Sequence, residues 1–382
     1  MAKNIIIFGA GASVESGAPL MQDFYEKSTS IVEKIGEEKF DNMYGDSYQL
    51  VESIRHKFQQ MHHKININYD NIEELLGLVE LGVMLDNIEF NNYNQDDIRK
   101  RVRHFIARTI EKSTNFPIDK NEGVIGPSPY NYLANYLSLA LSKKDNIKIN
   151  NYLSMFTFNY DLALDVSLNY KIPFQYGGLD EEKNDKKMSL YKMHGSLNFM
   201  YCPKCNYITY YPIGEILEKQ YPSYKLTLQN RIKMDDSDRE NNKNQTINIE
   251  IANRLNFASK TCPKSCSGTL HENFIIPPSW NKSQYFNLIQ NIWKKGAKEM
   301  SEAEAIFIIG YSLPETDMFF RHFMGIGTIG EKSIRKFHVY NPDKGVDRKF
   351  QEIIGTGVRS KYMFKPVEFN KDVVTEIVSN LV

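Results

Sequence analysis

The sequence predicts an α/β protein built on a doubly wound parallel sheet with helices on both faces. Short apolar runs at residues 4–8, 154–158 and 305–309 are expected to be buried strands. Two further strands are expected at 189–193 and 337–340. Strands that alternate with turns and helical segments in this way are typical of a parallel sheet.

Helical segments separate these strands. Apolar residues recur at helical spacing in residues 71–81, 96–112, 130–141 and 284–298. The segment 96–112 also carries basic side chains, namely Arg99, Lys100, Arg101, Arg103 and Arg108. We interpret them as the solvated face of a helix with an apolar underside; contact with a nucleic acid or a partner is the alternative. The stretch from roughly residue 20 to residue 150 is expected to be a helical insertion.

The composition is that of an ordinary globular protein. Apolar residues make up 41% of the 382 residues, and Lys plus Arg equal Asp plus Glu at 47 each. A chain that mainly binds DNA or RNA would normally carry a basic excess, so nucleic acid is not expected as its main ligand. No apolar run approaches the roughly 20 residues that span a bilayer, and no signal peptide is evident. We therefore expect a cytoplasmic protein without membrane contact.

A glycine-rich turn follows the first predicted strand. The turn contains Gly9, Ala10, Gly11 and Ser13. Glycines at such a place let the backbone approach a pyrophosphate, and the N-terminus of a following helix offers N–H groups to an anion. Val14 stands where the full dinucleotide-binding fingerprint has its third glycine. A tight strand-to-helix turn without a ligand is therefore the alternative at this point.

Four cysteines form two closely spaced pairs. The first pair is Cys202 and Cys205, and the second is Cys262 and Cys266. Two such pairs supply four thiolates, the complete tetrahedral shell of a structural Zn²⁺ site, and leave no open position for catalysis by the metal. Four unrelated buried cysteines are the alternative. We expect residues 199–275 to form a small zinc-ribbon module in which the very polar stretch 235–246 is an exposed loop.

Polar side chains stand at the ends of three predicted strands, where open α/β sheets bind their ligands. Asn159 and Asp161 follow the second strand, His194 follows the strand at 189–193, and Gly310 and Ser312 follow the strand at 305–309. A histidine at a strand end, followed by glycine, can reach a crevice and act as a general base near neutral pH. Each of these residues also has a simpler explanation as a cap, a turn or a hydrogen-bonded histidine.

Taken together and in this order, the motifs resemble those of the sirtuin family. Residues 9–19, GAGASVESGAP, resemble the sirtuin opening G-A-G-x-S-x-x-x-G-x-P, residues 157–161, TFNYD, resemble T-x-N-x-D, and residues 194–195 match H-G. The cysteine pairs follow in the family's order, and residues 266–270, CSGTL, resemble C-G-G-x-L. Residues 310–313, GYSL, resemble G-x-S-L, and Asn341 resembles the strand-end asparagine near the adenosine. The resemblance covers neither the helical insertion nor the loop between the cysteine pairs.

This resemblance implies a Rossmann-like NAD-binding domain over residues 1–198 and 276–382. The pyrophosphate of NAD would be lined by Gly9, Ala10, Gly11, Ser13, Gly310 and Ser312. Asn159 would position the nicotinamide ribose and a water, Asp161 would accept a hydrogen bond from the carboxamide, and His194 would be the base. Asn341 would contact the adenosine end. The implied reaction breaks the nicotinamide–ribose bond, which needs orientation and a base rather than a redox group.

The segment after the second cysteine pair departs from the family. Deacylating sirtuins have V-V-x-F-G-E there, an edge that pairs with an acyl-lysine peptide, whereas residues 274–280 read FIIPPSW. Pro277 and Pro278 have no N–H to donate to such a ladder. We therefore expect water as the acceptor and NAD hydrolysis to nicotinamide and ADP-ribose. A protein deacylase, and a module that senses NAD or ADP-ribose without turnover, remain the alternatives.

Divergent sirtuin-like proteins with a helical insertion and no peptide strand resemble the NAD-depleting effectors of bacterial anti-phage defence. That resemblance implies a homo-oligomer, which in some systems works beside a separate HerA-like ATPase subunit.

Overall fold

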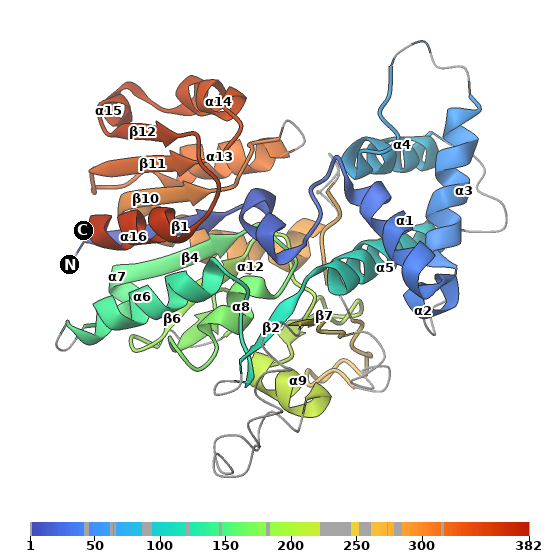
Figure 1. Cartoon of the computed structure of the whole chain (residues 1–382), viewed down its shortest axis with the longest axis horizontal. Coiled ribbons are helices and arrows are strands. Elements are labelled where there is room, and N and C mark those ends of the chain that lie inside the picture. Colours follow the sequence, from blue (N-terminus) through green and yellow to red (C-terminus); the bar gives the residue numbers. More distant parts are fainter. Residues whose placement is uncertain are drawn as a thin grey trace, which may run out of the picture.

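The computed structural model describes most of the chain (Figure 1). The described residues are 2–41, 46–61, 64, 66–85, 94–119, 123–144, 147–180, 184–221, 246–251, 261–272, 274–278, 285–314 and 317–381. Within these ranges, no helix combines the length and the apolar character that a membrane crossing requires.

Parallel strands form a seven-stranded central sheet in the order β12-β11-β10-β1-β4-β6-β5. Their bounds are β1 Lys3–Phe8, β4 Leu153–Thr157, β5 Phe174–Tyr176, β6 Met188–Lys192, β10 Ala303–Ile309, β11 Lys336–Tyr340 and β12 Tyr362–Lys365. The strands predicted at 4–8, 154–158, 189–193, 305–309 and 337–340 are β1, β4, β6, β10 and β11. The predicted α/β fold with a parallel sheet is therefore confirmed.

Helices cover both faces of this sheet. Neighbouring residues of a strand point to opposite faces, and Phe8 of β1 lies beside Thr157 of β4, so Phe156 points away from the face of Phe8. Phe8 contacts Tyr130 of α6 (Tyr130–Ser142), with 5.5 Å between the ring centroids. Phe156 contacts Phe323 of α13 (Met318–Gly327) at 6.2 Å. The sheet is thus doubly wound, as predicted.

The helices of the two faces pack in groups. On the face of Phe8, α6 packs against α8 (Ala163–Leu168) and α16 (Lys371–Asn380). On the other face, α13 packs against α12 (Phe286–Ser301). The segments predicted as helices at 130–141 and 284–298 correspond to α6 and α12. Further helices of the sheet domain are η1 (Ala10–Ser16, a 3₁₀ helix), α7 (Ile149–Tyr152), α14 (Gly345–Ile353) and α15 (Thr356–Arg359).

A group of helices between β1 and β4 stands beside the sheet domain (Figure 1). It comprises α1 (Phe24–Ile35), α2 (Glu37–Asp41), α3 (Ser47–Gln59), α4 (Ile72–Met84) and α5 (Gln95–Ser113). The segments predicted at 71–81 and 96–112 are α4 and α5. This group has its own core, whereas α6, which also falls within the stretch 20–150, belongs to the core of the sheet. The helices of this separate group therefore end at Ser113, and α6 is not one of them.

The cysteine-bearing region packs on the same second core. Its elements are β7 (Phe199–Tyr201), β8 (Ile208–Tyr210), α9 (Ile213–Gln220) and β9 (Thr246–Ile247), and β9 pairs with β2 (Phe116–Asp119), which also pairs with β3 (Gly123–Val124). Met200, Cys202 and Ile251 share a cluster with Phe105 of α5. The predicted exposed loop 235–246 lies outside the described residues except for Thr246, which begins β9.

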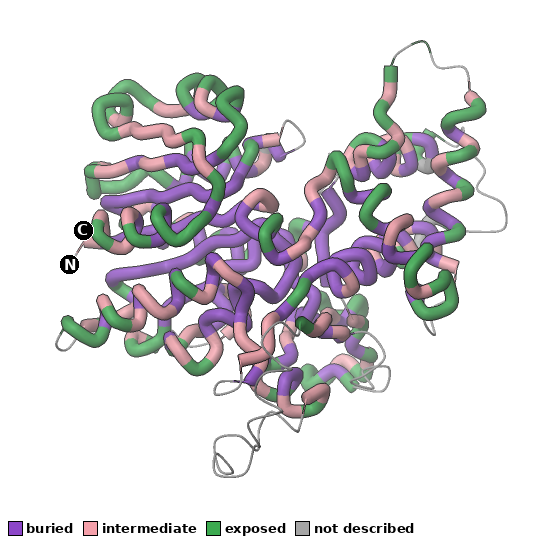
Figure 2. The backbone as a smooth tube through the Cα atoms, in the orientation of Figure 1, coloured by how far each residue is buried: buried purple, intermediate pink, exposed green. Residues whose placement is uncertain are grey.

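Helix α5 is buried along residues 104–111, so its basic residues are not all on a solvated face (Figure 2). Arg108 is 0% exposed and donates to a carboxylate oxygen of Glu111 at 2.6 Å and to the carbonyl oxygen of Phe40 at 2.8 Å. The other carboxylate oxygen of Glu111 accepts from the backbone N–H of Ile251 at 2.9 Å. Our interpretation of Arg108 as a solvated residue was wrong, because this ion pair instead ties α5 to residues 246–251.

Candidate functional site

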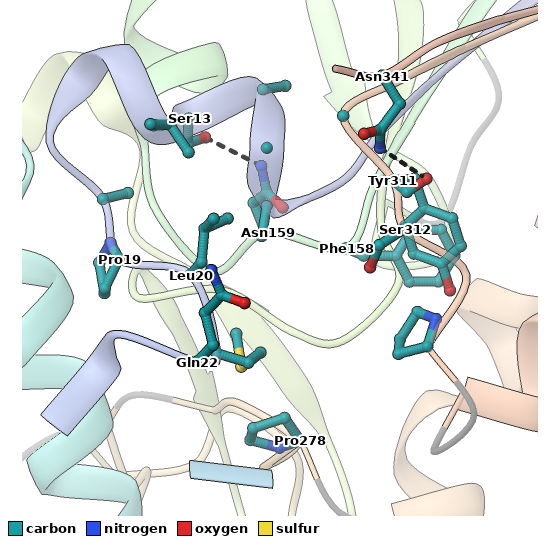
Figure 3. Close-up of a pocket in the computed structure, with 18 of the residues that line it drawn as sticks. Ser13, Pro19, Leu20, Gln22, Phe158, Asn159, Pro278, Tyr311, Ser312 and Asn341 are labelled. Atoms are coloured by element: carbon teal, nitrogen blue, oxygen red, sulfur yellow. Dashed lines mark hydrogen bonds between the residues drawn. The ribbon is translucent and has the colours of Figure 1, made fainter. Parts of the chain in front are cut away.

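The carboxyl ends of the central strands surround a cavity of about 910 Å³ (Figure 3). From β1 the sheet continues to β4 on one side and to β10 on the other, and α/β proteins bind ligands at such a reversal of strand order. The predicted residues that line the cavity are Ala10, Gly11, Ser13, Asn159, Asp161, His194, Gly310, Ser312 and Asn341. Gly9 is not in the lining, but its carbonyl oxygen accepts from Nδ2 of the lining residue Asn159.

The turn after β1 and the turn after β10 are in direct backbone contact. Gly9 N–H donates to the carbonyl oxygen of Ile309 at 2.9 Å, and Gly11 N–H donates to that of Gly310 at 2.8 Å. A Cβ atom on Gly9 would lie 2.5 Å from Cα of Tyr311. Gly310 has a φ of +61°, and a Cβ atom there would overlap the backbone nitrogen of Ala12. These glycines are therefore required by the packing of one turn on the other.

This contact changes how the turn can serve an anion. The segment that follows is the 3₁₀ helix η1 rather than an α-helix, and Gly11 N–H is already bonded to Gly310. The N–H of Gly11 is therefore not a donor to a ligand. The glycine contributes only because, without a side chain, it allows a close approach to its backbone. Ser13 lines the same cavity but is only 1% exposed.

Asn159 closes the floor of the cavity. Its Nδ2 donates to the carbonyl oxygen of Gly9 at 2.8 Å and to Oγ of Ser13 at 2.9 Å. Oγ of Ser13 is also 2.9 Å from the hydroxyl of Tyr130. Burial raises the pKa of Tyr130 well above its ordinary value, so its hydroxyl stays protonated at neutral pH. Tyr130 was missed from the sequence because an aromatic residue at the start of an amphipathic helix signals only core packing.

Asp161 is buried and accepts two hydrogen bonds from the protein. Its Oδ1 accepts from the backbone N–H of Ala163 at 2.9 Å, and its carbonyl oxygen accepts from Nζ of Lys192 at 2.7 Å. Lys192 also forms a buried ion pair with Asp165 at 2.9 Å. Burial raises the pKa of the Asp161 carboxyl, and the charge of Lys192 acts in the opposite direction. Asp161 thus lines the cavity, and the hydrogen bonds to Ala163 and Lys192 define its position.

His194 follows β6 and lines the cavity together with Phe158. The next residue, Gly195, has a φ of +81°, and a Cβ atom there would overlap the carbonyl oxygen of Phe274. The His194 ring meets Phe158 edge to face at 5.0 Å between centroids. Its Nε2 is 3.8 Å from Oδ2 of Asp317, a buried carboxylate that the sequence motifs did not point to.

Asn341 and Ser312 lie at the ends of β11 and β10. Nδ2 of Asn341 donates to the carbonyl oxygen of Tyr311 at 3.3 Å, and its Oδ1 accepts from the N–H of Asp343 at 3.0 Å. Ser312 is exposed, and its carbonyl oxygen accepts from Nζ of Lys349 at 3.4 Å. Figure 3 shows Asn341 beside Tyr311 and Ser312, as expected for neighbouring strand ends.

The helical insertion supplies one wall of the cavity. Asn71 and Glu73 at the start of α4 and Ile110 of α5 are among the lining residues. Oδ1 of Asn71 accepts from the N–H of Glu73 at 2.9 Å. Nothing in the local sequence signals this contribution, because it depends on where α4 and α5 lie relative to the strand ends.

The four cysteines lie together in a separate place. Their sulfur atoms all lie within 4.8 Å of one another, and the Cys202–Cys266 and Cys205–Cys262 sulfur pairs are 3.6 Å apart. A disulfide would need about 2.05 Å, whereas a tetrahedron of thiolates about 2.3 Å from a zinc ion has sulfur–sulfur edges of about 3.8 Å. A Cβ atom on Gly268 would lie 2.5 Å from Sγ of Cys202. The cluster therefore has the dimensions of a four-thiolate metal site.

Comparison with known proteins found no matching protein-family model and no matching curated protein. Three similar solved structures are a Sir2 homologue in complex with NAD, a mutant Sir2 homologue in complex with ADP-ribose, and Sir2Tm bound to a propionylated peptide. Their identities are 14%, 13% and 12%, and their TM-scores 0.38, 0.39 and 0.37. The matches cover 100%, 100% and 99% of this chain and 90%, 92% and 92% of the others. Because these values are low, the function of the cavity is inferred from its own residues.

Replacement of Gly310 by alanine tests the backbone contact beneath the cavity. Gly310→Ala is expected to lower the free energy of unfolding by about 2–5 kcal/mol, because a non-glycine residue at positive φ is strained and its Cβ overlaps Ala12. Gly325→Ala is the control: it lies in α13 with nothing within 4 Å, and should raise stability by at most about 1 kcal/mol. Denaturant titration followed by circular dichroism measures both. Equal stability of the two variants would contradict the requirement for glycine at position 310.

Proposed function

We propose that this chain is a sirtuin-like NAD⁺ glycohydrolase that breaks the nicotinamide–ribose bond and uses water as the acceptor. The observation that carries the proposal is that the strand-end motifs of β1, β4, β6, β10 and β11 all line one cavity. Its volume of about 910 Å³ lies in the range of small-molecule and cofactor sites. The cavity also combines a buried carboxyl, a carboxamide and an imidazole.

The roles of three residues follow from the chemistry of the bond. Breaking the bond builds positive charge on the ribose while nicotinamide leaves as a neutral molecule. Asp161, held by Ala163, would accept a hydrogen bond from the carboxamide of nicotinamide. Because Nδ2 of Asn159 bonds within the protein, its Oδ1 is the atom that would accept from a ribose hydroxyl or the attacking water. His194 would take the proton of that water as the C–O bond forms.

The described part of the segment after the cysteine pairs favours water over a peptide acceptor. The N–H of Ile276 donates to the carbonyl oxygen of His194 at 2.9 Å, and the carbonyl oxygen of Phe274 accepts from Ser196 at 2.9 Å. The backbone polar groups of residues 274 and 276 therefore point toward residues 194–196. Those of residues 275 and 277 point toward the opposite edge of the segment. Position 277 is a proline, so among the described residues 274–278 only Ile275 offers an N–H on that edge, where strand addition needs a row of them.

Removal of the base tests the assignment of the cavity. His194→Ala is expected to lower the rate of nicotinamide release from NAD by about a hundred- to ten-thousand-fold, the usual contribution of general acid–base catalysis. Asn159→Ala should also lose activity, whereas His322→Ala, an exposed residue of α13, should not. Chromatography of nicotinamide and ADP-ribose measures the rates, and circular dichroism checks the fold. Parental rates in both cavity variants would show that the site is wrongly placed.

Addition of an acetylated peptide tests the choice of acceptor. In a preparation that consumes NAD, nicotinamide and ADP-ribose should form at a rate that does not change with acetyl-lysine peptide, because the edge at Pro277 offers no ladder. Mass spectrometry distinguishes ADP-ribose from O-acetyl-ADP-ribose. Abundant O-acetyl-ADP-ribose would favour a deacylase instead. Binding of ADP-ribose without any release of nicotinamide would favour a sensing module.

We also propose that the cysteine cluster is a structural zinc site. The donor set of four thiolates and the 3.6 Å spacings fit zinc, and all four ligand positions would be filled by Cys202, Cys205, Cys262 and Cys266. When bound, the metal would join the two ends of a long insertion whose described return segment, residues 246–251, packs against α5. A closed shell of this kind holds structure and leaves catalysis to the cavity.

Metal analysis tests this proposal. The purified protein should contain about one zinc per chain, and Cys262→Ser should lower both the zinc content and the melting temperature. His271→Ala is the control, because this residue is exposed near the cluster, is a possible ligand type, and is not one of the four clustered residues. Elemental analysis and thermal unfolding are the measurements. Absence of zinc from parental protein prepared without chelators would rule the site out.

The sequence resemblance supports a proposal for the cellular role. It implies an NAD-depleting effector of anti-phage defence that works in the cytoplasm as a homo-oligomer, in some systems beside a HerA-like ATPase subunit. These remain predictions.

A further inference from the structure

We propose that Asp317 is a positioning residue for His194: the charge of its carboxylate favours the imidazole tautomer with the proton on Nε2, so that Nδ1 can act as the base. This inference rests on the proposed function, since it assigns a role within the same cavity. Asp317 and His194 both line the cavity, and Nε2 of His194 is 3.8 Å from Oδ2 of Asp317. The carboxylate follows the predicted motif at 310–313 but lies outside the motif itself.

The placement of the Asp317 carboxylate is not that of a helix cap. Asp317 occupies the N-cap position of α13, where an aspartate normally accepts from the backbone N–H groups of the first turn. Its side chain makes no such bond. Instead, Oδ2 accepts from the hydroxyl of Tyr311, and the same oxygen is the one closest to His194. The side chain has thus been turned from its own helix toward the cavity.

The surroundings hold this arrangement in place. Asp317 is 2% exposed and His194 is 7% exposed, so the charge of the carboxylate is little screened by water. Phe158 packs against both His194 and Tyr311, with centroid distances of 5.0 and 4.8 Å. Burial and the charge of Asp317 raise the pKa of Tyr311 well above its ordinary value. Tyr311 therefore remains a donor to Asp317 at neutral pH.

The arrangement supplies what the base requires in the proposed hydrolysis. The bond between the ribose carbon and the nicotinamide nitrogen breaks, and its electron pair leaves with nicotinamide. Water forms the new bond to that carbon, and its proton passes to Nδ1 of His194 and then to solvent. The imidazolium that exists between these transfers is stabilised by the carboxylate of Asp317. The products are nicotinamide, ADP-ribose and one proton.

Removal of the charge of Asp317 tests the inference through turnover. Asp317→Asn should lower kcat by about 10-fold or more, but by no more than the loss of the base in His194→Ala. KM and the affinity for ADP-ribose should stay nearly unchanged. Asp347→Asn is the matched control. Asp347 lies in α14 and, like Asp317, accepts a hydrogen bond from a tyrosine hydroxyl, here that of Tyr362 at 2.8 Å. This variant should keep the parental kcat. Tyr311→Phe removes the donor to Asp317 and should lower kcat in the same direction even if Asp317→Asn fails to fold.

Two measurements separate positioning from a general effect on the fold. In a His194→Ala background, Asp317→Asn should change the residual kcat by less than about twofold, because it acts through the missing imidazole. In ¹⁵N-histidine-labelled protein, Asp317→Asn should shift the ring-nitrogen resonances of His194, assigned with His194→Ala, and leave the other histidines unchanged. A parental kcat in Asp317→Asn, an equal loss in both backgrounds, or unshifted His194 resonances would overturn the inference. A shifted His194 in a protein that never releases nicotinamide would overturn the glycohydrolase proposal alone.

Discussion

The cavity depends on the direct contact between the backbone turns that follow β1 and β10. Gly11 donates to Gly310 across this contact, and neither Gly9 nor Gly310 has room for a Cβ atom. On one side of the contact, Ser13 is brought to Asn159, and on the other, Tyr311 is brought to Asp317. A side chain at either glycine would separate the turns and move both halves of the cavity. The glycines therefore act through packing, and whatever they offer a pyrophosphate is secondary to this.

The strand-end residues were predictable because a parallel sheet has one carboxyl edge. Once the strands were recognised from their apolar runs, Asn159, His194 and Asn341 had to lie at that edge, whatever the connections between the strands. Tyr130 and Asp317 were not predictable in the same way. Each reaches the site from the start of a helix, and its contact depends on how that helix packs on the sheet. The strands β5 and β12 were missed because they are short or only half-buried and lack a continuous apolar run.

Helix α5 shows a second limit of sequence patterns. Its basic residues were interpreted as a solvated face, and Arg108 is instead enclosed completely. A buried guanidinium is tolerable only when it is paired and hydrogen-bonded, and its partners include Glu111 on the same helix and Glu250, which is 142 positions away in the chain. The i,i+3 spacing to Glu111 is visible in the sequence, but the approach of residues 246–251 is not. The burial of a charge cannot be inferred from one element alone.

The cysteine cluster and the cavity are mechanically connected, although they are separate in chemistry. Tyr201, directly before Cys202, exchanges backbone hydrogen bonds with His271, and the chain then runs to Ile276, whose N–H donates to the carbonyl oxygen of His194. Phe274 accepts from Ser196 on the way. The segment that leaves the cysteine cluster is therefore the one that fixes the backbone on either side of Gly195. If the cluster holds zinc as proposed, loss of the metal would disturb the backbone of His194 through this short path. A closed four-thiolate site would then influence the proposed hydrolysis without taking part in it.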